Sequence, residues 1–229
     1  NSVKSQIFKD YEYIVVDGKS TDGTSQIIKK NLRKNKYNIN ILKKDKNLYQ
    51  ALNHGIKKSK GEYIVILHSG DLFYSMNTLN MISENIKKND AISGNILYKK
   101  RDKVIRFWNY KIKKFNKFSA FKVAHTSLVV KTSIIKRING YDSQYSISSD
   151  TDFILKLSLV KKLKFKYLNE IFVIMESGGL SNSYKNLFTK ILQDFKIYKK
   201  YFNKSFIFFY LFKLNYKLIK LLLWKLFKC

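Results

Sequence analysis

Residues 45–71 read DKNLYQALNHGIKKSKGEYIVILHSGD. The first part of this stretch, Leu48–Lys58, has helical character, and the Ser-Lys-Gly that follows is typical of a helix end. The second part, Glu62–Leu67, is dominated by Val, Ile and Tyr and is typical of a strand. A carboxylate, Asp71, comes shortly after that strand. The stretch therefore predicts a helix and a strand of an α/β sheet, with an acidic group near the strand end.

The same alternation of strands and helices continues on both sides of this stretch. We expect strands at Tyr11–Val16, Asn38–Leu42 and Leu163–Val173, helices at Ser25–Leu32, Leu79–Lys87, Thr132–Ile138 and Asp150–Leu159, a strand-like basic region over residues 91–122, and an apolar run at Ser127–Val130. This order predicts an α/β fold with a mainly parallel central sheet flanked by helices. Ligands of such sheets bind at the carboxyl ends of strands, where Asp17 and Asp71 lie.

The chain is strongly basic, with 45 Lys and Arg against 16 Asp and Glu in 229 residues and a formal net charge of +29. Nucleic acid, an anionic membrane and a phosphate-bearing substrate would each suit this charge. Lys outnumbers Arg by 41 to 4 and proline is absent, so the codon bias of an AT-rich genome accounts for part of it. The single cysteine, Cys229, excludes a disulfide framework and a cysteine-based zinc site.

The composition shifts at Lys185. Residues 185–229 hold eleven Lys and one acid, Asp194, among many Phe, Leu, Ile and Tyr, which predicts a basic amphipathic helical tail. The tail is either a helical subdomain packed on the core or, as we favour, an anchor at an anionic membrane surface. We therefore divide the chain into a domain at 1–184 and a tail at 185–229. No uncharged stretch reaches the ~18 residues that a membrane-spanning helix needs.

Four acidic residues, in three segments, follow or begin an expected element, and each also has a purely structural interpretation. Asp17 and Asp71 suit turns beside glycine and serine. Asp150 and Asp152 suit the first turn of a helix, where the helix dipole favours acids. The functional alternatives are a carboxylate that binds a divalent cation on a diphosphate, at Asp71, and a general base, at Asp150.

Taken together, these stretches resemble the family 2 glycosyltransferases of the GT-A fold. The segments that carry the resemblance read EYIVVDGKSTDGT, DKNLYQALNHGIKKSKGEYIVILHSGD and HTSLVVKTSIIKRINGYDSQYSISSDTDFILKL. The order and the spacing match as well as the residues, over roughly residues 1–184. The later Gly178-Gly179-Leu180-Ser181 is similar to the GG-x-S element of the subgroup that builds colanic acid and related surface polysaccharides.

On the donor side, the resemblance implies that Asp17 holds the nucleotide base or ribose. Asp45 and Asn53 lie in the segment that lines the same pocket. Asp71 matches the last acid of the family's metal-binding motif and would hold Mn²⁺ or Mg²⁺ on the donor diphosphate. The earlier acids of that motif are replaced by His68 and Gly70.

On the acceptor side, the resemblance implies that Asp150 is the base that deprotonates the attacking hydroxyl. His68, His125 and Asp152 are expected near the acceptor or in the pocket. A single base suits a single displacement, which inverts the anomeric centre.

The resemblance thus implies an inverting transferase that moves a sugar from a nucleotide-diphosphate sugar, such as a UDP-sugar, to a glycan or lipid-linked acceptor. Its expected setting is the synthesis of bacterial surface polysaccharide, lipopolysaccharide or capsule, on the cytoplasmic face of the plasma membrane. The alternatives are a basic nucleic-acid-binding protein, which lacks a recognised motif here, and an inactive GT-A-like membrane scaffold. The family also has a strand before the segment that matches Ser5-Gln6, so we expect the sequence to be truncated at its start.

Overall fold

The computed structural model describes residues 2–32, 38–42, 45, 47–101, 103–176 and 186–227. The Gly178-Gly179-Leu180-Ser181 element lies outside the described residues. The elements follow one another as β1 (Tyr13–Asp17), α1 (Thr24–Leu32), β2 (Asn38–Leu42), α2 (Leu48–Lys58), β3 (Tyr63–Val65), β4 (Leu72–Phe73), α3 (Thr78–Ile86), β5 (Ala91–Lys100), β6 (Lys103–Trp108), η1 (Ala120–Lys122), η2 (His125–Ser127), β7 (Leu128–Lys131), α4 (Thr132–Arg137), α5 (Ser149–Ser158), β8 (Phe165–Glu176), α6 (Leu187–Phe202), η5 (Asn203–Ser205) and α7 (Phe206–Phe227). The expected α/β class and the order of its strands and helices are confirmed.

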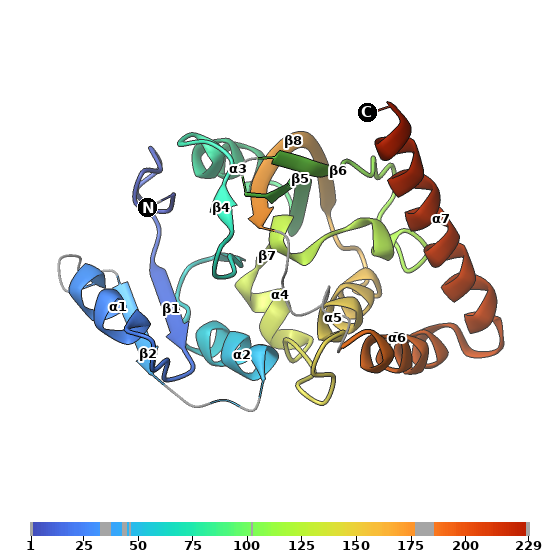
Figure 1. The fold of residues 1–229 in the computed structure, drawn as a ribbon, viewed down its shortest axis with the longest axis horizontal. Coiled ribbons are helices and arrows are strands. Elements are labelled where there is room, and N and C mark those ends of the chain that lie inside the picture. The colour runs from blue at the N-terminus through green and yellow to red at the C-terminus, as the bar shows by residue number, and fades with distance from the viewer. Residues whose placement is uncertain are drawn as a thin grey trace.

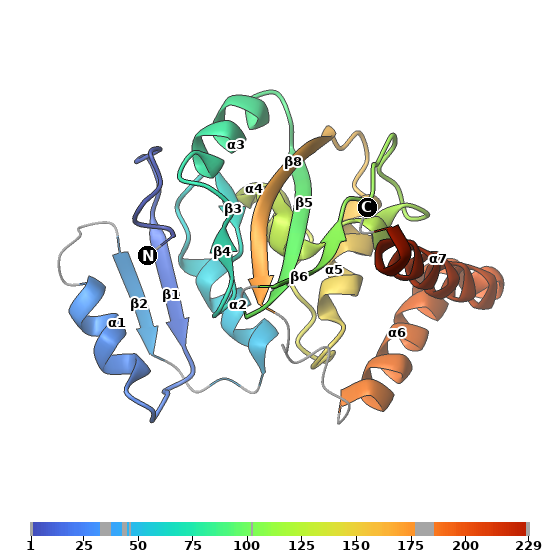
Figure 2. The ribbon, with the colours of Figure 1, turned by 45° about the horizontal axis from the view of Figure 1, so that its top comes forward.

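The strands form two sheets, which Figure 2 shows side by side. β1 and β2 pair in parallel, while the six-stranded sheet has the order β3-β7-β5-β8-β4 with β6 on the edge of β5. Within the six-stranded sheet only β5 and β8 are parallel, so the expectation of a mainly parallel sheet is wrong there. One reason is the short connection between β5, which ends at Lys100, and β6, which begins at Lys103, because so few residues can join only antiparallel neighbours.

Both faces of the six-stranded sheet are buried, because successive side chains of a strand point to opposite faces. Ala91, Leu128 and Val130 join one hydrophobic cluster, together with residues of α2, α4, α5 and α6. Ile92 and Val129 join the other cluster, together with residues of α3. Figure 1 shows α4 and α5 beside the central strands and α3 at the opposite border. The sheet is thus a rigid central layer for the loops at its ends.

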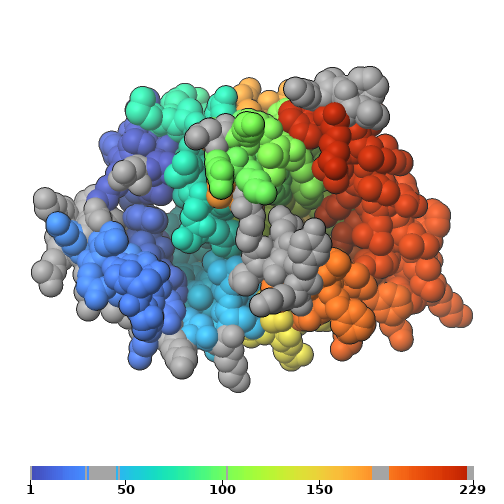
Figure 3. All heavy atoms as spheres, viewed as in Figure 1, coloured from blue at the N-terminus to red at the C-terminus, as the bar shows by residue number. Residues whose placement is uncertain are grey.

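The C-terminal helices pack on this layer. α6 buries Ile197, Tyr198 and Phe202 in the cluster that also contains α5. α7 packs on α6 and reaches β6, where the indole N–H of Trp224 donates to the Ile105 carbonyl oxygen at 2.8 Å. Figures 1 and 3 show the two helices along one border of the molecule. Across the described ranges, no helix has the length and apolar character that a membrane span requires.

Candidate active site

Asp71 occupies a tight turn between β3 and β4. Gly70 before it has a φ of +89°, a left-handed conformation that favours glycine, and the Asp71 N–H donates to the His68 carbonyl oxygen at 3.0 Å. The Asp71 side chain is buried, with 8% of the residue exposed, and its Oδ2 has no hydrogen-bond partner among the described residues. Burial raises the pKa of this carboxyl to about 6. The turn therefore presents a carboxylate oxygen without a protein partner.

Two histidines connect the Asp71 turn to the first turn of α5. The Nε2 atoms of His68 and His125 lie 2.6 Å apart, and the Nδ1 of His125 lies 3.4 Å from the Oδ2 of Asp150. When both rings are neutral, both contacts are satisfied if the His125 Nδ1–H points at Asp150 and the His68 Nε2–H points at His125. The His68–His125–Asp150 row thus joins the turn after β3, η2 and α5.

The electrostatics of the row keep its carboxylate ionised. Burial alone would raise the pKa of Asp150, but the hydrogen bond and the charge of His125 outweigh it, and the pKa is held well below its ordinary value. Burial and the neighbouring His125 lower the pKa of His68 to about 4. At neutral pH the row therefore offers a carboxylate that can accept a proton and a neutral His68 ring.

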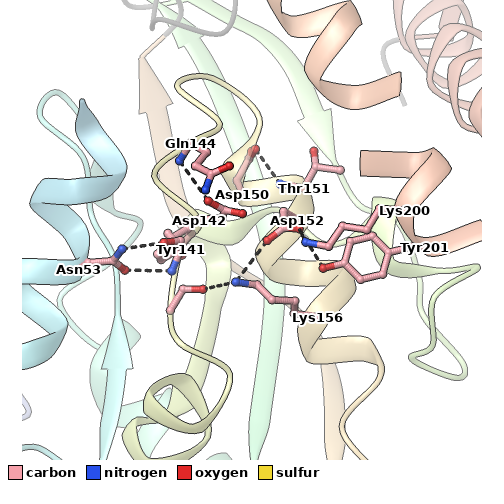
Figure 4. Close-up of polar contacts among 11 residues, drawn as sticks. Asn53, Tyr141, Asp142, Gln144, Asp150, Thr151, Asp152, Lys156, Lys200 and Tyr201 are labelled. Atoms are coloured by element: carbon pink, nitrogen blue, oxygen red, sulfur yellow. Dashed lines mark hydrogen bonds and ion pairs between the residues drawn. The ribbon is translucent and has the colours of Figure 1, made fainter. Parts of the chain in front are cut away.

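α2 holds the loop that leads into α5. The Asn53 amide donates from Nδ2 to the Tyr141 carbonyl oxygen at 2.6 Å and accepts from the Tyr141 N–H at 2.9 Å, as Figure 4 shows. Asn47 caps α2 through Tyr49 N–H and Gln50 N–H, and its own amide donates to the Ser143 carbonyl oxygen at 2.8 Å. Asn53, expected to line the nucleotide pocket, here fixes the backbone of the 140–148 loop.

Two tyrosines that the sequence analysis did not single out complete the surroundings of Asp150. The Tyr49 hydroxyl donates to the Ile147 carbonyl oxygen at 2.6 Å and lies 3.4 Å from the Asp150 Oδ1. The rings of Tyr49, Tyr141 and Phe153 stack in sequence, with centroids 5.6 and 4.4 Å apart. The signal that could have found Tyr141 was its place in the quoted Gly140-Tyr141-Asp142 segment.

Asp17 lies at the carboxyl end of β1, as expected, and is buried. It accepts hydrogen bonds from the N–H and hydroxyl of Ser20 and from the hydroxyl of Ser25. The bonds from Ser20 and Ser25 lower the pKa of Asp17. The turn is therefore organised around an ionised carboxylate, and both serine partners lie in the segment that follows β1.

Asp45 lies just before α2, and its Oδ1 is 3.0 Å from the Nδ1 of His54. α2 is also close to β1, because a Cβ at Gly55 would lie 3.3 Å from the Val16 side chain. The structure thus brings Asp45 to the helix that lies on β1, the strand that ends at Asp17. This placement is compatible with the shared pocket that the resemblance implies.

Asp152 is directed away from the row, toward α6. Its Oδ1 accepts from Lys200 at 3.0 Å and from the Tyr201 hydroxyl at 2.8 Å, and its Oδ2 lies 3.2 Å from the Lys156 Nζ (Figure 4). The residue is fully buried. Asp152, expected near the acceptor, is therefore placed in an ion-pair network that ties α5 to α6.

The donor set fits a divalent cation that is shared with a substrate. Within the described part of the chain, no group of three or more His, Cys, Asp or Glu side chains is arranged to hold a metal ion alone. Mg²⁺ is commonly held by one or two carboxylates together with substrate phosphates. The buried, unpartnered Oδ2 of Asp71 suits that mode.

Comparison with solved structures supports the fold. A crystal structure of S. aureus TarS 1-349 in complex with UDP aligns with a TM-score of 0.67 and 17% identity, over 90% of this chain and 66% of that one. The same TarS fragment in complex with UDP-GlcNAc aligns equally well, with a TM-score of 0.67 over 90% and 67% of the two chains.

Comparison with known sequences extends the likeness. A PGL/p-HBAD biosynthesis glycosyltransferase of Mycobacterium bovis is 24% identical over 194 residues, which are 80% of this chain and 72% of that protein. An uncharacterized glycosyltransferase of Methanocaldococcus jannaschii, MJ1057, is 28% identical over 185 residues, 74% of this chain and 61% of that protein. The family model for glycosyl transferase family 2 matches residues 1–150. The chain therefore belongs to glycosyl transferase family 2 and is a glycosyltransferase of the GT-A fold.

Proposed function

We propose that this glycosyltransferase moves a sugar from a UDP-sugar to a hydroxyl of a glycan or lipid-linked acceptor, with inversion at the anomeric carbon. The observation that carries the proposal is the His68–His125–Asp150 row, which begins at the same turn as the unpartnered Asp71 carboxylate. A single displacement requires two groups, one that binds the diphosphate and one that accepts the proton. UDP and UDP-GlcNAc in the related TarS structures support a uridine donor.

The donor is held from two sides in this proposal. Asp17, at the end of β1, accepts a hydrogen bond from a hydroxyl or a base N–H of the nucleotide. Asp45 lines the same pocket. Asp71 would hold Mn²⁺ or Mg²⁺ through its unpartnered Oδ2. When bound there, the cation supplies Lewis-acid stabilisation of the charge that develops on the leaving diphosphate.

The acceptor hydroxyl attacks the anomeric carbon while the bond from that carbon to the diphosphate oxygen breaks. The proton of the hydroxyl passes to a carboxylate oxygen of Asp150. His125 positions that carboxylate, because the His125 Nδ1 lies 3.4 Å from the Asp150 Oδ2. The Asp150 Oδ1 then faces the Tyr49 hydroxyl. His68 holds His125 in turn, so the histidines are positioning residues.

We place this reaction in bacterial surface polysaccharide synthesis, in the subgroup that builds colanic acid and related polymers, on the inner face of the plasma membrane. The 185–229 tail supports the membrane setting, because α6 and α7 expose many large apolar side chains beside exposed lysines. The large exposed apolar residues of α6 and α7 are Leu187, Phe188, Ile191, Leu192, Phe195, Ile207, Phe208, Leu211, Phe212, Leu214, Leu218, Ile219, Leu222 and Leu223. An exposed apolar surface of this extent marks an interaction site.

The transferase reaction is tested by incubating the protein with individual nucleotide sugars and Mn²⁺ and measuring the nucleoside diphosphate released. We expect metal-dependent release with at least one UDP-sugar, and faster release when a membrane lipid extract supplies acceptors. If none of the nucleotide sugars released nucleoside diphosphate in either condition, the proposal would be contradicted. Salt-sensitive binding of single-stranded nucleic acid without sugar transfer would favour the nucleic-acid alternative instead.

Membrane docking is tested with three serine substitutions on the outer face of α7, at Leu211, Leu218 and Leu222. Each leucine contributes about 1 kcal/mol at an interface, so the triple variant should bind phosphatidylglycerol vesicles about a hundredfold more weakly in flotation assays. Substitution is preferable to deletion of the tail, because α6 supplies Ile197 and Phe202 to the core.

The matched control changes three exposed apolar residues outside the tail, Ile7, Met76 and Leu159, to serine. This variant should float like the parent protein. Equal flotation of the α7 variant and the parent would refute docking through α7.

A further inference from the structure

Between Lys213 and Trp224, α7 directs lysine side chains toward the protein, in contrast to an ordinary surface helix. The face toward the protein carries Lys213, Tyr216, Lys217, Lys220 and Trp224, at the three- and four-residue spacing of one helix side. The face toward solvent carries the leucine, isoleucine and phenylalanine side chains named above. Helices of soluble domains bury the apolar stripe and expose the charges. The inward position of these lysines therefore needs a separate explanation.

These inward cations lie on aromatic rings of β6 and the segment after it. The Lys217 Nζ is 5.0 Å from the Trp108 ring centroid, and the Arg106 guanidinium carbon is 4.7 Å from the same ring. The Lys220 Nζ is 5.8 Å from the Tyr110 ring centroid. Trp108 and Tyr110 are buried, and the cations are half-buried. We call Arg106, Lys217 and Lys220 with these two rings the cation–aromatic cluster.

The cluster has positive charge without a matching carboxylate. Lys213, one turn earlier on α7, pairs with Asp194 at 2.8 Å. Among the described residues, Arg106, Lys217 and Lys220 take part in no ion pair, and the Arg106 guanidinium donates only to the Tyr110 hydroxyl, at 3.2 Å. Half-buried cations of this kind are stabilised by an anion. The cluster thus has the charge and the donors of a site for a phosphoryl group.

The site adjoins the segment that leads to His125, because the Trp108 indole N–H donates to the Lys122 carbonyl oxygen at 2.8 Å. Burial and the neighbouring Lys213 lower the pKa of Lys217 to about 7, against the charge of Asp194, so a bound anion would favour the protonated form of this lysine at neutral pH. Tyr98, whose ring lies 5.7 Å from the Arg106 guanidinium carbon, packs on the same hydrophobic cluster as Ala124, the residue before His125. The cluster therefore lies between α7 and the segment that leads to His125.

We propose that the cation–aromatic cluster binds the phosphoryl group of a lipid-borne acceptor while the outer face of α7 rests on the membrane. The proposal deepens the function proposed above and rests on its lipid-linked acceptor. A lipid tail suits the exposed apolar face of α7, and its phosphoryl group suits the unpaired cations on the other side of the same helix. The sugar beyond the phosphoryl group then lies toward Asp150.

The chain has two tryptophans, one of which, Trp108, is in the cluster, so binding can be followed by fluorescence. A Trp224→Phe background leaves Trp108 as the single reporter. We titrate this protein, without donor or metal, with farnesyl diphosphate below its micellar concentration. We expect saturable quenching, and we expect Arg106→Gln and Lys217→Gln each to raise the dissociation constant about tenfold.

Lys225→Gln is the matched control, since Lys225 is an exposed lysine in the last turn of the same helix. It should leave the dissociation constant within about twofold, because its charge lies outside the cluster. Lys217→Arg keeps the charge and should retain binding. Unchanged affinity in both glutamine variants, or equal weakening in Lys225→Gln, would overturn the proposal.

Two further ligands separate the possible sources of the phosphoryl group. Inorganic pyrophosphate that binds as tightly as farnesyl diphosphate would overturn the lipid-borne assignment in favour of a free phosphate. Phosphatidylglycerol vesicles that alone saturate the quenching would overturn it in favour of bulk headgroups. Because no donor is present, a failure here leaves the release of nucleoside diphosphate untouched, and loss of that release leaves this binding measurable.

Discussion

The Asp150→Asn variant is expected to release nucleoside diphosphate about a thousandfold more slowly than the parent, with little change in donor affinity. The carboxamide keeps the size of the side chain but accepts no proton, and general base catalysis contributes about a hundred- to ten-thousandfold. The contacts with His125 and Tyr49 can be kept by the amide, so the loop should stay in place. Donor affinity is measured by equilibrium titration with the UDP-sugar.

Asp10→Asn is the control, because it removes the same charge from an exposed residue near the start of the described chain. Its rate should lie within about twofold of the parent, as is usual for a surface substitution. If Asp150→Asn kept the parent's rate and cellular function, Asp150 would not be the base, and the inactive-scaffold alternative would gain support.

His125 offers a separate measure of positioning. Its removal leaves Asp150 in place but takes away the hydrogen bond that holds Oδ2. A positioning residue changes the rate of the chemical step more than the affinity for the donor. If His125 served only to fill the core, the rate of the chemical step would not change more than the donor affinity.

The strand-end acids were predictable from sequence because strand runs and turn residues are local signals. Asp17 ends one strand and Asp71 follows another, and the pattern of Val, Ile and Tyr already marks both strands. The row of His68, His125 and Asp150 was not predictable from spacing, since the three come from segments far apart in the sequence. Only the packing of β7 between β3 and β5 brings η2 to the turn after β3.

The different positions of Asp150 and Asp152 follow from helix geometry. Residues two apart on an α-helix point about 200° apart, so two acids in the same first turn cannot both face the row. Asp150 contacts His125, and Asp152 contacts Lys200 on α6. The choice between them depends on where α6 packs, which the sequence of α5 does not contain. For the same reason, the amphipathic pattern of the tail did not reveal that Lys213, Lys217 and Lys220 face inward.

The second large effect is expected for Asp71→Asn, which should lose metal-dependent release while gaining stability. Loss of the carboxylate removes the proposed cation ligand, and stabilisation of a leaving group by a metal is worth several kcal/mol, so the rate should fall at least about a thousandfold. Added Mn²⁺ and UDP should raise the melting temperature of the parent but not of the variant, because only the parent binds the pair tightly.

The gain in stability follows from the raised pKa of Asp71. The pKa is 3.8 in the unfolded reference and about 6 in the folded protein, so folding favours the protonated form. The contribution is fully present below pH 4 and is lost as the pH rises through 6, at a cost of about 3 kcal/mol above that pH. Without metal at pH 7.5, Asp71→Asn should therefore unfold at a higher urea concentration than the parent. At pH 4 the difference should largely disappear.

The titration of Asp71 also predicts the acidic limb of the plot of release rate against pH. Asp150 stays ionised at mildly acidic pH because His125 holds its pKa low, so the limb should come from Asp71. Below pH 6 protons compete with Mn²⁺ for the Asp71 carboxylate, and the apparent metal affinity should fall about tenfold per pH unit. Raising the Mn²⁺ concentration tenfold should move the limb about one unit toward lower pH. If the limb did not move with metal concentration, Asp71 would not be the metal ligand, and the limb would belong to another titrating group.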